Sequence, residues 1–119
     1  MDEELRPSTP EEYYEHTTKL VKLSNGFVFK IQAMGARSTV YFYTLVPEEG
    51  LSQDEGAINR FLVENFIGLR DNIIMPCIVE PKIQAERIKF EDLAELLVEI
   101  MRLSGVIPQQ DEILSPNNA

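Results

Sequence analysis

The chain has few of the residues that build catalytic and metal sites. Among its 119 residues there is one cysteine, Cys77, and one histidine, His16. A single cysteine excludes an intrachain disulfide framework and a cysteine-rich zinc site, and a single histidine excludes a multi-histidine metal site. No run of apolar residues approaches the roughly 18 that a membrane span needs. We therefore expect a chain without disulfides, metal or transmembrane helices.

The motifs of common catalytic chemistry are missing too. Gly50 and Gly56 are spaced too widely for a phosphate-binding loop, and no Lys-Ser or Lys-Thr pair follows them. Ser24 and Ser104 lack the flanking glycine of a nucleophile elbow. Basic and aromatic residues do not interleave densely enough for a nucleic-acid groove. By elimination we expect no catalytic residue and no cofactor, and a non-enzymatic binding or assembly role.

Acidic residues are absent from one long stretch of a strongly acidic chain. The net charge is −9, yet residues 18–47 hold four bases and no acid, whereas residues 1–17 hold six acids and one base. Such an acidic chain is not expected to bind nucleic acid or an anionic membrane as its main partner. The acid-free stretch has two interpretations: it packs against acidic segments of the same chain, which we favour, or it forms a basic docking face.

The N-terminal region predicts a short capped helix. Thr9 can serve as the N-cap, Pro10 suits the first helical position, and Glu12 can complete a capping box. His16 is expected to act as a cation near the end of this helix rather than as a catalytic base.

An Asn-Gly turn between two apolar segments predicts a β-hairpin. Residues 20–23 and 27–31 flank Ser24-Asn25-Gly26, and asparagine and glycine both tolerate positive φ. The period of two puts three side chains of the second strand on one face: Phe27, Phe29 and Ile31.

The region after the hairpin leaves one segment open. Residues 38–46 fit a strand by their β-branched and aromatic content, and a helix by the capping serine Ser38. A further helix is expected to begin at Ser52, with Glu55 as its capping partner, and to end at Gly68.

Two more helices are predicted toward the C-terminus. The apolar run 73–79 indicates a buried helix kinked near Pro76. A parallel-sheet strand is the alternative, which Pro76 disfavours. Burial in this run makes Cys77 an unreactive structural thiol. Residues 90–104 show the clearest amphipathic pattern, which places Leu97 in the core and ends at Gly105.

Four acidic residues lie along this last helix: Glu91, Asp92, Glu95 and Glu99. Carboxylate metal sites converge from several elements or follow a calcium-loop pattern, so no metal is expected here. The row is either a solvated helix face or a contact surface for a partner protein, and we take the four as candidate partner-binding residues. Lysine at both Glu95 and Glu99 is then expected to leave folding nearly intact.

Together these patterns predict an α+β, mainly helical fold with an N-terminal β-hairpin, about four packed helices and a disordered C-terminal tail. The expected organisation is a flexible N-terminus over residues 1–8, one globular domain over residues 9–106 and a disordered tail over residues 107–119. The acidic N-terminus does not fit a targeting signal, so a cytoplasmic location is expected.

Several phrases, read in order, carry a family resemblance. They are RPSTPEEY at 6–13, LSNGFVFKI at 23–31, PCIVEPKI at 76–83 and LSG at 103–105. This layout resembles the small tail assembly chaperones of long-tailed bacteriophages and prophages, over most of residues 6–105.

The resemblance implies a mainly helical protein whose segment after the hairpin is helical, which favours a helix over residues 38–46. It implies binding to the tape measure protein, the long, helical, aggregation-prone ruler of the tail, until tail tube subunits polymerise around it. No catalytic residue is implied. The alternatives are a structural tail or neck completion subunit retained in the virion, or a small acidic regulatory binding protein, and a homo-oligomer is left open.

Overall fold

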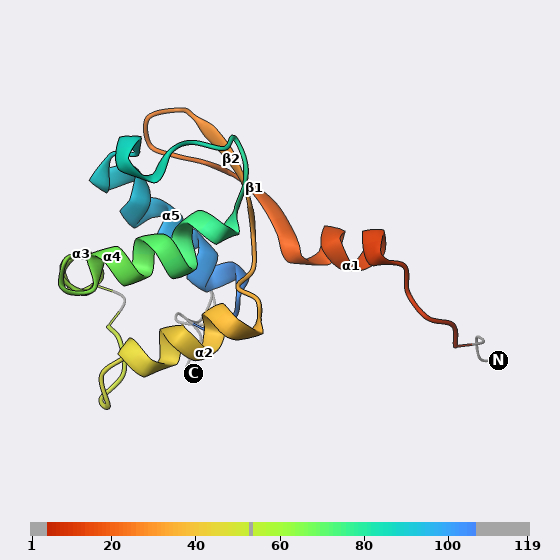
Figure 1. The fold of residues 1–119 in the computed structure, drawn as a ribbon, viewed down its shortest axis with the longest axis horizontal. Helices are drawn as coiled ribbons and strands as arrows, with labels where there is room; N and C mark the ends of the chain where they lie inside the picture. The colour runs from red at the N-terminus through yellow and green to blue at the C-terminus, as the bar shows by residue number, and fades with distance from the viewer. Residues whose placement is uncertain (1–4, 53, 107–119) are drawn as a thin grey trace, which may run out of the picture.

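Helices and one small antiparallel sheet make up the described part of the chain (Figure 1). The computed structural model describes residues 5–52 and 54–106. Within these ranges the mainly helical α+β class is as predicted. The predicted tail over residues 107–119 and the first four residues of the predicted flexible N-terminus lie outside the described residues, so both stay predictions.

Helix α1 (Pro10–Thr17) begins with the predicted capping box. The Glu12 backbone N–H donates to Thr9 Oγ1 at 3.1 Å, and the Thr9 N–H donates to the Glu12 carboxylate at 2.9 Å. His16 lies in its last turn, as predicted. None of the residues of α1 is buried, and Figure 1 shows the helix extending away from the other elements.

The hairpin forms where the Asn-Gly turn predicted it. Strand β1 (Thr18–Lys22) pairs antiparallel with β2 (Val28–Gln32), and Gly26 has the positive φ of 92° that the turn requires. Ile31 shares the buried face with Phe29, whereas Phe27 is 68% exposed. Phe27 directly precedes β2, so the predicted face is buried at Phe29 and Ile31 and open to solvent at its start.

A third strand pairs with the hairpin, but it is antiparallel and short rather than the parallel strand that was the alternative for residues 73–79. Residues 73–79 do not form one kinked helix: the π-helical turn η1 (Arg70–Ile74) passes into the 3-10 turn η2 (Met75–Cys77), and then strand β3 (Ile78–Glu80) pairs with β2. Pro76 has no N–H with which to continue a helix. The free edge of β2 offers the following backbone groups the hydrogen bonds that a helix would have supplied.

Residues 38–45 are helical, as the resemblance implied, within α2 (Ala36–Leu45), and Val46 is its C-cap. The predicted cap was wrong, because the N-cap is Gly35 and the Ser38 hydroxyl instead donates to the Asn72 carbonyl at 2.9 Å. Phe42 is the buried side chain of α2, and its ring meets that of Phe61 edge to face at 5.9 Å.

The helix expected over residues 52–68 is divided in two. Helix α3 (Glu55–Glu64) is capped by Asp54, whose carboxylate accepts from the Ala57 N–H at 3.2 Å, so the prediction of a Ser52 cap was wrong. The Asn65 backbone, at φ −124° and ψ 33°, separates α3 from the short α4 (Phe66–Leu69).

Gly68 lies inside α4 and does not end a helix, which corrects a second expectation. A Cβ placed on Gly68 would overlap the Tyr41 hydroxyl and lie 3.0 Å from its Cζ.

Gly68→Ala is therefore expected to lower the free energy of unfolding by about 1–3 kcal/mol through overpacking. Adding Tyr41→Phe removes the hydroxyl and should recover most of this loss in urea unfolding. A Gly68→Ala protein as stable as the parent would contradict the contact.

Helix α5 (Phe90–Leu103) follows the 3-10 turn η3 (Ala85–Arg87) and confirms the clearest prediction. It ends before Gly105, whose φ of 78° suits a helix stop. Its inner side chains are almost completely buried: Leu93, Leu96, Leu97, Ile100 and Met101. This helix packs against the inner side of the hairpin and against η1, so it is the centre of the core.

Candidate functional site

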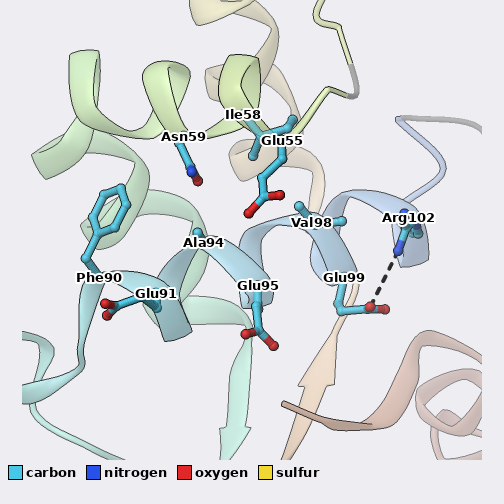
Figure 2. A pocket seen from close by; sticks show the side chains of 10 residues that line it. All are labelled: Glu55, Ile58, Asn59, Phe90, Glu91, Ala94, Glu95, Val98, Glu99 and Arg102. Atoms are coloured by element: carbon cyan, nitrogen blue, oxygen red, sulfur yellow. Dashed lines mark ion pairs between the residues drawn. The ribbon is translucent and has the colours of Figure 1, made fainter. Parts of the chain in front are cut away.

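A groove of about 440 Å³ lies between α3 and α5 (Figure 2). Figure 2 shows α3 along one side and α5 along the other. We call it the α3–α5 groove, and its lining residues are Glu55, Ile58, Asn59, Phe90, Glu91, Ala94, Glu95, Val98, Glu99 and Arg102. Three of the four predicted partner-binding residues are therefore among those that line it.

Apolar side chains form the base of the groove. Ile58 of α3 is 3% exposed, and Ala94 and Val98 of α5 are half-buried. Ala94 and Val98 are four residues apart, so they lie on the same side of the helix. This base offers an apolar strip that a partner could cover.

Phe90 forms one end of the groove and is held in place by neighbouring side chains. Its ring stacks on Phe66 of α4 at 6.4 Å, and the Arg70 guanidinium lies over the Phe66 ring at 5.5 Å. Phe90 remains 36% exposed. An exposed aromatic ring fixed by its neighbours is a good anchor for a bound partner, because little side-chain entropy is lost on binding.

Carboxylates line both sides of the groove. Glu55 reaches from α3 toward α5, whereas Glu95 and Glu99 lie on the side of α5 turned away from α3 (Figure 2). Glu91 is exposed near the Phe90 end. Within residues 5–52 and 54–106, Glu55 and Glu91 make no ion pair. These two carboxylates are therefore the ones most available to a basic partner.

The other three predicted residues hold the hairpin against α5. Asp92 accepts from Asn25 Nδ2 at 3.1 Å, and Glu95 accepts from the Ser24 N–H at 2.9 Å. Glu99 lies 3.5 Å from Lys19 Nζ and 3.5 Å from an Arg102 guanidinium nitrogen.

These contacts favour the internal interpretation of the acid-free stretch, which packs against acidic residues of the same chain. They also give Glu95 and Glu99 contacts to the hairpin, which argue against the expectation that lysine at both positions leaves folding nearly intact. The hairpin turn was the one sequence signal for these contacts, because an Asn-Gly turn leaves backbone N–H groups that need hydrogen-bond acceptors. Sequence spacing alone does not tell which helix supplies them.

Comparison with known proteins leaves the family open. No protein-family model, curated protein or solved structure matches this chain. The function is therefore inferred from the geometry of the α3–α5 groove together with the sequence resemblance.

Other site types find little support in the described ranges. Residues 5–52 and 54–106 contain no group of three or more His, Cys, Asp or Glu side chains that could hold a metal ion. No helix in the same ranges is long and apolar enough to cross a membrane.

Cys77 is buried, as predicted, and desolvation raises the pKa of its thiol to about 11. At pH 8 only about a thousandth of the thiol is then ionised, and the thiolate is the reactive form. We expect a disulfide reagent such as Ellman's reagent to leave the native protein almost unmodified and to modify one thiol per chain in urea. Rapid labelling of the native protein would contradict the burial of Cys77.

Proposed function

We propose that this protein is a non-enzymatic tail assembly chaperone of a long-tailed phage or prophage, acting in the host cytoplasm. Its client is the tape measure protein, which it keeps soluble during tail assembly. The observation that carries the proposal is the α3–α5 groove, with its apolar base and carboxylates on both sides. Such a groove suits one face of an amphipathic helix, and the sequence resemblance implies a long helical client.

The charges define the kind of helix that fits. A client helix with apolar residues three and four positions apart would cover Ala94 and Val98, beside the buried Ile58. Lysine or arginine side chains beside that apolar stripe would face Glu55 on one side and Glu91 on the other. Exposed ion pairs speed association and set orientation more than they add affinity, which suits a client that must be released to the tail tube.

The hairpin supports the groove in this proposal. Contacts from Asp92, Glu95 and Glu99 fix α5 against the hairpin, and α5 forms one wall of the groove. We regard the hairpin and the helical segments that follow it as one client-binding unit. This is the layout that the resemblance implies.

A tagged pull-down tests the identity of the client. The chain is expressed within its native gene neighbourhood and captured, and its partners are identified by mass spectrometry. The proposal expects stoichiometric recovery of one very long, helix-rich tail protein and no copy of the chain in purified virions. Recovery of tail tube or neck subunits, with the chain present in virions, would favour a structural subunit.

The salt dependence of client binding distinguishes the chaperone from the alternative, an acidic regulatory protein that binds through charge alone. An apolar base keeps part of the affinity when charges are screened, whereas charge mimicry does not. Raising salt from 0.05 to 0.5 M, about a threefold change in screening length, is expected to weaken client binding less than about tenfold. Complete loss of binding at the higher salt, measured by calorimetry, would contradict the proposal.

A further inference from the structure

Helix α1 is a folded element that no other described element covers, over residues 5–52 and 54–106. It has a complete capping box and no buried residue, and Tyr13 and Tyr14 are 65% and 63% exposed. An isolated helix of eight residues is only marginally stable in water, so a cap alone does not account for it. We propose that α1 of one copy docks on the outer face of the β1–β2 hairpin of a second copy. This proposal does not depend on the α3–α5 groove.

The connection to β1 prevents α1 from covering its own hairpin. Helix α1 ends at Thr17 and β1 begins at Thr18, so no residue separates them. Thr18 is already extended, at φ −120° and ψ 160°. A helix needs a linker of several residues to turn back over the strand that follows it. Figure 1 shows α1 continuing outward from the end of the hairpin instead.

The outer face of the hairpin combines apolar and basic side chains. Leu20 lies opposite Lys30, and Lys22 lies opposite Val28 in the strand register. Leu20 and Val28 are 68% and 51% exposed, since the alternate residues of each strand face the core. The result is a small apolar patch with two lysines, which we call the hairpin patch.

The two lysines of the hairpin patch, Lys22 and Lys30, form no ion pair in the described ranges, although one has an acidic neighbour. Glu80 of β3 is the acidic residue facing Lys30 in the register. Lys22 and Lys30 therefore give the hairpin patch a positive charge in a chain whose net charge is −9.

Helix α1 presents the complementary pattern. Glu11, Tyr14 and Glu15 are three and four positions apart, so they share one side of the helix. An aromatic ring between two carboxylates matches an apolar patch between two lysines. Residues 1–17 carry six acids against one base, which adds attraction toward the positive face. Two copies can exchange their helices and satisfy both patches in a closed dimer.

Two charge-reversed variants of the full chain test this docking. One carries Glu11→Lys and Glu15→Lys in the helix, and the other carries Lys22→Glu and Lys30→Glu in the patch. Sedimentation velocity over a concentration series is expected to show self-association of the parent above its 13.6 kDa monomer. Each variant alone is expected to dimerise at least about tenfold more weakly, because its helix and patch then have the same sign of charge.

Mixing the two variants gives the decisive result. In the mixture a basic helix meets an acidic patch and an acidic helix meets a basic patch, so association should return to within about threefold of the parent. A variant that merely lost its helix could not be rescued in this way. Glu48→Lys with Glu49→Lys, on an exposed turn, makes the same charge change and should associate like the parent.

Three results would overturn the proposal. The first is a parent that stays monomeric at every concentration. The second is a mixture that stays as weak as its separate variants, and the third is a control pair that weakens association as much as the helix pair.

Discussion

Leu97→Asp is expected to prevent folding. Leu97 is 0% exposed in the middle of α5, which packs against both the hairpin and η1. The change removes a buried leucine side chain, worth about 2–5 kcal/mol, and places an unpaired carboxylate in the core. The sum is comparable with the whole stability of a domain of this size, about 5–15 kcal/mol. Circular dichroism should show a chain without a cooperative thermal transition at 20 °C and above.

Val63→Asp is the matched control for this experiment. Val63 lies on α3 and is 61% exposed, so aspartate there remains solvated. Its unfolding free energy should stay within about 0.5 kcal/mol of the parent. If Leu97→Asp melted as the parent does, α5 could not be the centre of the core.

Replacing Glu95 and Glu99 together with lysine is expected to destabilise the protein by about 2–3 kcal/mol. The Ser24 N–H loses its carboxylate acceptor, which costs about 1–2 kcal/mol. Lysine at position 99 also faces Lys19 and Arg102, and reversing such exposed pairs costs about 1 kcal/mol. Urea unfolding measures the loss, and hydrogen exchange at the Ser24 amide should accelerate.

The control variant reverses the charge at two glutamates that do not hold the hairpin in place. Glu55→Lys with Glu91→Lys makes the same change in net charge but breaks no ion pair in the described ranges. Its stability should stay within about 1 kcal/mol of the parent. Equal destabilisation by the two pairs would mean that net charge, rather than docking of the hairpin, accounts for the effect.

Local patterns were sufficient to predict some elements. The capping box at Thr9 and Glu12, the Asn-Gly turn and the amphipathic pattern of α5 each depend on residues within one or two turns of one another. Their interactions are contained in the segment itself, so the sequence predicts them. The burial of Cys77 followed in the same way from an apolar run.

Elements that depend on distant partners were not predictable in this way. Strand β3 forms because β2 offers an open edge, about 50 residues earlier in the chain, to the backbone that follows Pro76. Gly68 stays inside α4 because Tyr41 of α2 packs against it. Neither contact leaves a periodic pattern in the sequence.

The candidate site shows the same division between local and distant information. The row of carboxylates on α5 was visible in the sequence, but its opposing wall on α3 was not, so Glu55 was missed. The roles of Asp92, Glu95 and Glu99 depend on a hairpin about 70 residues away. A charge pattern can be found from sequence, whereas the partner of each charge requires the fold.

The most direct test of the client-binding groove measures its affinity for the tape measure protein. Overlapping helical segments of the tape measure protein from the same gene cluster are titrated by fluorescence anisotropy into the full-length parent and into Glu55→Lys with Glu91→Lys. We expect at least one segment with an amphipathic, basic pattern to bind the parent and to bind the variant at least about tenfold more weakly. Equal binding to parent and variant, or no binding of any segment, would contradict the account.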